Sequence, residues 1–297
     1  MKEKSCSFKF LAASAMVMFL LPQAFASFSF SGSNGIWSGS NYQSVSSWSQ
    51  VSSDDKIAVG YTDQGSLEGD GGSVESLNRI YVGHNHYGEL SLSGEGTTLN
   101  VNGSENLSVG MGASGLIEVL SGAALNTNHN LVIGDGDLGE MTINNGTVNC
   151  TNHLIFNYKD NSDNSSITIT NGGSLTSNTY LYTVNNTANL TIEDGSASFE
   201  NIYAAGSSVT NVNIGLEGSI YLAGGGDSID SFIEAISKDS NASFELKLWN
   251  DGAYVSYSSL QENTDYFVSD GMITVPEPCS IMLFSLGGML LRRKTAV

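Results

Sequence analysis

The sequence predicts an all-β protein folded as a parallel β-helix, a β-solenoid of about seven or more coils. The first observation is a repeat: short apolar strands recur with starts 23, 27, 24, 23, 27 and 21 residues apart. The second is that each repeat also holds a strand that alternates apolar and polar residues, as expected of a strand with one buried face. The third is that all three prolines, Pro22, Pro276 and Pro278, lie near the chain ends. Because one such unit cannot bury its apolar face alone, the units must stack.

The first strand of each unit has an apolar core and in most units is followed by glycine. Its copies begin at Ile57, Ile80, Leu107, Leu131, Leu154, Leu181 and Ile202. The alternating second strand is seen in residues 90–93, 141–144, 167–170, 190–193 and 212–214. A third short strand follows a Gly- or Asn-containing turn, in residues 98–101, 147–150, 174–176 and 219–222. Three strands per coil favour a right-handed β-helix, and seven coils give a rod on the order of 35 Å long.

The second strands fix a register for the core. If the units stack as assigned, one buried column should contain Leu92, Val119, Ile143, Ile169, Ile192 and Ile214. Residues 57–226 therefore form the predicted solenoid.

The flanking segments differ from the repeats in composition. Residues 27–56 are rich in serine and carry Trp37, Tyr42 and Trp48, which predicts an aromatic N-terminal cap that shields the first coil from edge pairing. Residues 227–274 begin with a helical pattern, Ile229, Phe232, Ile233 and Ile236, with Asp227 or Ser228 as the N-cap. Strands near residues 244–249, 253–257, 266–268 and 272–275 should follow. We expect a small α/β C-terminal cap, with a separate domain as the alternative.

Residues 1–26 have the three parts of a secretory signal peptide. Lys2, Lys4 and Lys9 precede an apolar run of about a dozen residues, and Ala24 and Ala26 form an A-x-A cleavage site. The run is shorter than the roughly 20 residues of a membrane span, which disfavours the alternative of a retained anchor. Signal peptidase is therefore an expected partner, and the mature chain should start near Ser27.

The C-terminal residues 275–297 also have three parts. Val275, Pro276, Glu277 and Pro278 precede an apolar stretch from Cys279 to Leu291 and a basic tail of Arg292, Arg293 and Lys294. This arrangement resembles the PEP-CTERM sorting signal of exported bacterial proteins. The resemblance implies processing by an exosortase near the motif, an inner-membrane intermediate, and release to the cell surface or extracellular matrix. A permanent C-terminal anchor is the alternative.

The repeats resemble those of autotransporter passengers and PEP-CTERM proteins over about residues 57–222, where a Val-Gly strand precedes a G-x-L-x-I-x-x-G strand. That resemblance implies surface display or matrix association and carries over no catalytic residues. Without residues 1–26 and the basic tail, the chain has five basic residues and 29 acidic ones, Glu277 included, which gives a net charge of about −24. Such a surface repels nucleic acid, which proteins bind through cationic contacts to phosphate.

Candidate ligand sites are few. Asp135, Asp137, Asp160 and Asp163 lie in predicted turns and leave weak structural calcium open, although neither segment matches an EF-hand or a tandem calcium repeat. We otherwise expect no cofactor. His84, His86, His129 and His153 fall at different places relative to their strands, so we interpret them as solvent-exposed turn residues. The sequons at Asn102, Asn145 and Asn189 are interpreted as turn or ladder residues, and Cys150 is the one cysteine between the signals.

These features predict an exported structural or adhesive protein of the cell surface or exopolysaccharide matrix. A carbohydrate-binding surface module is the alternative. A polysaccharide-active enzyme is disfavoured, because such sites gather several carboxylates with a lysine or arginine, and the five basic residues are scattered. We therefore expect no enzymatic activity.

Overall fold

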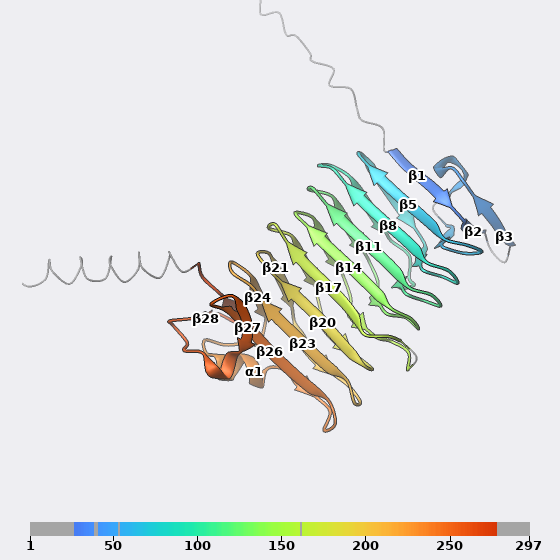
Figure 1. The fold of residues 1–297 in the computed structure, drawn as a ribbon. Helices are drawn as coiled ribbons and strands as arrows, with labels where there is room; N and C mark the ends of the chain where they lie inside the picture. The colour runs from blue at the N-terminus through green and yellow to red at the C-terminus, as the bar shows by residue number, and fades with distance from the viewer. Residues whose placement is uncertain (1–26, 39–40, 53, 161, 278–297) are drawn as a thin grey trace, which may run out of the picture.

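The computed structural model describes residues 27–277 except 39, 40, 53 and 161. Three long sheets run along a rod, and successive strands of each sheet come from successive coils (Figure 1). Among the described residues, seven complete coils contain one strand from each sheet, in agreement with the predicted parallel β-solenoid. The predicted signal peptide, residues 1–26, and the segment from Pro278 onward lie outside the described residues.

We name the three sheets A, B and C. In order along the rod, sheet A contains β1 (Ser27–Gly32), β5 (Gly65–Asp70), β8 (Gly88–Ser93), β11 (Gly115–Leu120), β14 (Gly139–Asn144), β17 (Ser165–Thr170), β20 (Thr187–Ile192), β23 (Val209–Ile214), β26 (Ser243–Asn250) and β27 (Ala253–Ser256). Sheet B contains β3 (Asn41–Val45), β2 (Asn34–Ser38), β4 (Lys56–Val59), β7 (Arg79–Val82), β10 (Leu107–Val109), β13 (Leu131–Ile133), β16 (Leu154–Phe156), β19 (Tyr180–Thr183), β22 (Asn201–Ala204) and β25 (Ser237–Lys238).

Sheet C contains β6 (Ser73–Leu77), β9 (Thr98–Val101), β12 (Ala124–Thr127), β15 (Thr147–Cys150), β18 (Ser174–Ser177), β21 (Ser196–Phe199), β24 (Ser219–Leu222), β29 (Met272–Thr274) and β28 (Phe267–Ser269). The predicted Val-Gly strands all fall in sheet B, and the predicted alternating strands fall in sheet A. Within each coil, the chain therefore passes first through sheet B, then through sheet A and then through sheet C.

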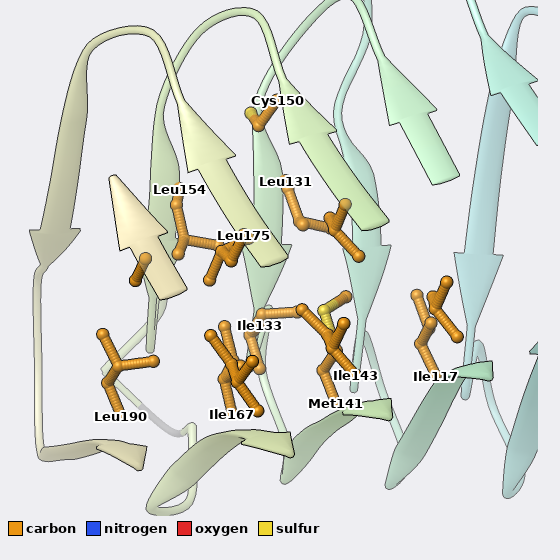
Figure 2. Packing of buried hydrophobic residues seen from close by; sticks show 14 of the residues in the cluster. Ile117, Leu131, Ile133, Met141, Ile143, Cys150, Leu154, Ile167, Leu175 and Leu190 are labelled. Atoms are coloured by element: carbon orange, nitrogen blue, oxygen red, sulfur yellow. The ribbon is translucent and has the colours of Figure 1, made fainter. Parts of the chain in front are cut away.

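The core consists of apolar columns that run along the rod. The predicted column is confirmed: Leu92, Val119, Ile143, Ile169, Ile192 and Ile214 are register partners from coil to coil, and all are fully buried. A second column runs beside it through Ile117, Met141, Ile167 and Leu190 (Figure 2). Stacking of identical positions gives every buried side chain an apolar neighbour on both sides, which is what a single coil lacks.

The glycine of the Val-Gly strand has a specific steric role. Gly60, Gly83, Gly110 and Gly134 have φ values of 76°, 74°, 70° and 85°, in the left-handed region. A Cβ on Gly83 would lie 2.4 Å from the carbonyl oxygen of Ala113 in the next coil. The fifth coil has Asn157 at this position with φ of 52°, because asparagine tolerates this conformation better than most residues.

Antiparallel strands occupy both ends of the rod. At the N-terminal end β1 pairs with β5 and β2 pairs with β4, and the ring of Phe28 lies beside Gly69, where the buried column has no side chain. Of the aromatic residues predicted for this segment, Tyr42 stacks on Tyr61 with ring centroids 3.9 Å apart. The side chains of Trp37 and Trp48 lie outside the description.

At the C-terminal end, α1 (Ile229–Glu234) begins after Ser228, whose hydroxyl accepts a hydrogen bond from the Ser231 amide. Ser228 is therefore the N-cap, whereas Asp227 accepts a hydrogen bond from the Asp270 amide. Phe232 is fully buried against the last coil. The predicted strands of this segment are present as β26 to β29, and the short 3-10 helices η1 (Trp48–Gln50) and η2 (Tyr257–Ser259) complete the elements.

Candidate functional site

The outer face of sheet B changes character along the rod. In the first five coils the outward central positions Ala58, Tyr81, Ser108, Val132 and Ile155 are buried, at 8% exposure or less. The corresponding residues of the next two coils, Tyr182 and Tyr203, are half-buried. The central position of the outer face is thus buried in the first five coils and half-buried in the sixth and seventh.

Turn length changes at the same point along the rod. The turn from sheet B to sheet A has five residues in the first four coils and eight in the fifth, but three and four in the sixth and seventh. In the second coil the turn lies against the sheet: the ring of His84 contacts that of Tyr81, with centroids 5.2 Å apart, and also approaches Tyr61 at 5.4 Å.

The open part of sheet B forms a groove of about 500 Å³, which we call the aromatic groove. It is lined by His153, Ile155, Tyr180, Tyr182, Asn201, Tyr203 and Ser237. These residues form two rows in register along the rod. One row runs through Ile155, Tyr182, Tyr203 and Ser237, and the other runs through His153, Tyr180 and Asn201.

Neighbouring rings within each row are close. Tyr182 and Tyr203 have centroids 5.1 Å apart and planes 30° apart, and His153 and Tyr180 have centroids 5.5 Å apart. The column of tyrosines ends at Ser237, a small residue paired with Tyr203. Tyr180 is 37% exposed.

Hydrogen bonds fix two of the groove side chains. The Tyr203 hydroxyl donates to Oδ1 of Asp239 at 2.8 Å, while Oδ2 of Asp239 accepts from the Gly206 amide at 2.7 Å. The amide bond, followed by the tyrosine bond, lowers the pKa of Asp239, and the bond to this carboxylate raises the pKa of Tyr203. On the other row, Nδ1 of His153 lies 2.7 Å from Oγ1 of Thr179.

The N-terminal part of the same face carries a cluster of two cations and one carboxylate. Lys56 and Arg79 are register partners, and Glu105 binds both, at 2.7 Å from the lysine Nζ and 2.8 Å from an arginine nitrogen. The Arg79 guanidinium also lies 4.2 Å from the Tyr81 ring centroid. Hydrogen bonds from Lys56, then Arg79, lower the pKa of Glu105.

A second groove, of about 490 Å³, lies near the C-terminal end and is lined by Thr170, Asn171, Glu193, Asp194, Gly215, Leu216, Trp249 and Tyr254. Trp249 and Tyr254 face each other across β26 and β27 with centroids 5.2 Å apart. Asp194 accepts a hydrogen bond from the Asn171 amide and so holds the turn of the neighbouring coil. Among the residues that line this groove, two are carboxylates and none is lysine or arginine.

Asparagine ladders cover other parts of the outer surface. Asn100, Asn126 and Asn149 on sheet C are joined side chain to side chain by hydrogen bonds of 2.8 Å. The interpretation of the sequons is confirmed: Asn102 accepts from Asn128, Asn189 accepts from Asn211, and Asn145 has φ of 51° in a turn. The sequon asparagines therefore have structural roles, as the sequence predicts.

The carboxylates considered for calcium do not converge. Asp135 is 4% exposed and lies 3.1 Å from Nζ of Lys159 in the next coil. Asp137 accepts from Ser114 and from the Leu138 amide, whereas Asp160 and Asp163 are exposed. Within the described ranges, no three His, Cys, Asp or Glu side chains come together as a metal site.

The histidines are less exposed than predicted. His86 is exposed, but His84, His129 and His153 are half-buried. His84 is held between aromatic rings, and its burial lowers its pKa. His129 contacts Asn106 through Nδ1 at 2.9 Å. The prediction of solvent-exposed turn histidines is therefore wrong for three of the four, because stacked coils bring a side chain of a neighbouring unit against each of them.

Cys150 is the free cysteine of the described chain, and it is buried in the core. Its thiol donates to the carbonyl oxygens of His129 and His153, at 3.2 and 3.3 Å. Burial raises its pKa to about 11, so the thiolate needed for redox or nucleophilic chemistry is scarce at neutral pH.

The predicted sorting residues are described only in part. Val275 is 1% exposed, and its carbonyl oxygen accepts a hydrogen bond from the Glu217 amide at 2.8 Å. Glu277 is exposed, and its carboxyl group shares a hydrogen bond with Glu217 that raises the pKa of Glu217. Pro276 lies between Val275 and Glu277 in the chain. The signal cleavage residues Ala24 and Ala26, as well as Pro278 and the basic tail Arg292, Arg293 and Lys294, fall outside the described residues.

Sequence reasoning missed the aromatic groove. Tyr180, Tyr182 and Tyr203 lie in two strands that match the repeat less well than the others, and their outward positions carry no part of the apolar pattern. The signal in the sequence was the alignment of the coils, because Tyr182 and Tyr203 occupy equivalent positions in successive coils once the register of the second strands is fixed. A second signal was the shorter spacing, in these two units, between the first strand and the alternating strand that follows it.

Within the described part of the chain, no helix has the length and hydropathy to cross a membrane. Comparison with protein-family models, with curated proteins and with solved structures found no match to this chain.

Proposed function

We propose that this chain is an exported, non-enzymatic structural or adhesive protein of the cell surface or exopolysaccharide matrix. The observation that carries the proposal is the uninterrupted stack of seven coils with apolar columns inside and short polar side chains outside. Such a stack is a stiff rod, because each coil is bonded along three sheets to its neighbours. A stiff polar rod suits display or spacing at a surface.

The charge distribution supports a role outside the cell. The body between the terminal signals carries about −24, which favours solubility and disfavours binding to nucleic acid. The N-terminal signal peptide and the tripartite C-terminal segment expected from the sequence supply a route for export and sorting. Signal peptidase and an exosortase are the partners that this route requires.

Sorting can be tested by fractionation with an antibody to the body of the protein. Alanines at Pro276, Glu277 and Pro278 should leave export intact and stop C-terminal processing, so that the variant stays in the inner membrane. Alanines at Arg292, Arg293 and Lys294 should also stop normal C-terminal processing, because the basic cluster holds the tail on the cytoplasmic side and so keeps the motif at the membrane. As matched controls, Lys238→Ala and Lys247→Ala remove basic residues of the body and should be sorted normally. Normal processing of the motif variant would contradict the proposal.

A carbohydrate-binding module is the second candidate, and the aromatic groove is the observation that favours it. The two functions are compatible, since a matrix protein needs a means of holding matrix polymer.

A further inference from the structure

We propose that the aromatic groove over β16, β19 and β22 binds a neutral oligosaccharide segment. The inference rests on the proposed function, because it names the matrix component that the rod would hold. It concerns His153, Tyr180, Tyr182, Asn201 and Tyr203, which the description of the fold leaves without any role in the core.

The groove is a specific opening in an otherwise covered face. Five consecutive coils bury the outward central residue of sheet B, and the two coils in which it is half-buried carry tyrosine there. Cross-strand aromatic pairs alone stabilise a sheet, but that role does not require the turns to shorten from five or eight residues to three and four. The volume of about 500 Å³ falls within the range of small-ligand sites.

The side chains in the groove combine apolar rings with hydrogen-bonding groups. A sugar ring presents apolar C–H faces together with hydroxyl groups, so it is bound by aromatic faces flanked by donors and acceptors. Tyr182 and Tyr203 supply rings in one row, while His153, Tyr180 and Asn201 supply both kinds of group in the other. Asp239 holds the Tyr203 hydroxyl at 2.8 Å, which fixes that ring before a ligand arrives.

The charge around the groove selects a neutral ligand. None of the residues that line it is Asp, Glu, Lys or Arg. The body as a whole carries about −24, so an acidic polysaccharide would be repelled on approach and would find no cation in the groove. The second groove is less suitable for a neutral sugar, because Glu193 and Asp194 lie in its wall.

The proposal is tested with the full chain, purified in a detergent without a sugar headgroup. Cellohexaose, maltohexaose, chitohexaose and mannohexaose serve as neutral probes, and hexagalacturonate serves as the acidic probe, with binding measured by calorimetry. We expect at least one neutral probe to bind and Tyr182→Ala to weaken it about tenfold or more, since a ring contact contributes on the order of one factor of ten. Tyr180→Ala, at a more exposed position, should weaken it similarly without affecting the fold.

Two controls separate binding from folding. Tyr221 on sheet C is 38% exposed, close to the 37% of Tyr180, but lies outside the groove, so Tyr221→Ala should bind like the unchanged protein. Tyr182→Phe keeps the ring and should retain most of the affinity. The proposal is overturned if no neutral probe binds at about 1 mM, if hexagalacturonate binds more tightly than the neutral probes, or if Tyr180→Ala and Tyr182→Ala both bind like the unchanged protein.

Failure of the groove and failure of the proposed function give different results. Fractionation of cells that produce the Tyr182→Ala variant reports sorting alone, and we expect it to reach the surface fraction. A surface-located protein that binds no glycan overturns the groove and leaves the proposed function standing. A protein that binds glycan but stays in the inner membrane at full length overturns the proposed function and leaves the groove proposal standing.

Discussion

Ile143 and Ile169 are register partners on β14 and β17, and both are fully buried in the same apolar column. The neighbouring residue Thr168 points outward from the same strand and is half-buried. Ile169 and Thr168 therefore lie on opposite faces of sheet A within one strand, with Ile169 toward the core and Thr168 outward.

Replacing Ile169 with Asp should destabilise the protein strongly. The carboxylate would be buried without a partner, at a cost of several kcal/mol in the free energy of unfolding. Thr168→Asp is the matched control, because it places the same charge on the outer face and should change the stability little. Thermal unfolding monitored by circular dichroism distinguishes them, and an unchanged melting temperature for Ile169→Asp would show that the register is wrong.

Much of the fold follows from the sequence because the repeat fixes a register. Leu92 to Ile214 could be assigned to one column from spacing alone, since a one-residue error would turn every side chain to the other face. The pairing of Asp135 with Lys159 and of Glu105 with Lys56 could not be assigned in this way. Those contacts depend on how far a turn extends from its coil. Asp135 and Lys159 lie in turns from sheet B to sheet A, which vary from three to eight residues, and Glu105 lies in one of the turns from sheet C to sheet B, which vary from one to five.

The groove was hidden for the same reason. The alignment places Tyr182 and Tyr203 in one row, but only the turn geometry shows that this row is open while Tyr81 in the same row is covered. Likewise, the closing of the first coil by Phe28 beside Gly69 depends on an antiparallel strand that lies outside the repeat pattern.

Gly83→Ala should destabilise the protein more than Gly96→Ala. Both glycines have positive φ, 74° and 83°, so the backbone strain of about 1–2 kcal/mol is shared. A Cβ at Gly83 would also meet backbone oxygens of the next coil at 2.4 and 2.5 Å, whereas a Cβ at Gly96 has no atom within 4 Å. Overpacking should add about 1–3 kcal/mol at Gly83. Equal losses in chemical denaturation would argue against the close approach of the two coils.

The Glu105 cluster should make stability depend on pH. Hydrogen bonds from Lys56 and Arg79 lower the folded-state pKa of Glu105 below 4.5. A depressed carboxyl pKa contributes stability that is present above pH 4.5 and is lost as the pH falls through the folded value. Because Glu105 is 36% exposed, the contribution is about 1 kcal/mol or less. Glu105→Gln should lower the melting temperature at pH 7 and have little effect near pH 3, and an equal effect at both values would be inconsistent with the ion pairs.

The end of the folded body should lie at Val275. A chain that stops after Val275 retains β29 and the bond from the Glu217 amide, so it should unfold like the longer protein. A chain that stops after Asp270 loses β29, exposes the edge of β24 and should melt at a lower temperature. Proteolysis at low protease concentration provides a second readout, and equal resistance of the two chains would show that β29 contributes nothing.

The mass of the mature protein tests the central claim of export and sorting most directly. The protein is recovered from the surface or matrix fraction of its own cells, and its two ends are determined by intact-mass and terminal-peptide measurement. The account predicts a chain that begins at Ser27 and ends after Val275 but before the apolar run that starts at Cys279. Recovery of the protein from the inner membrane with Arg292, Arg293 and Lys294 still attached would contradict it and would leave a permanent tail anchor in its place.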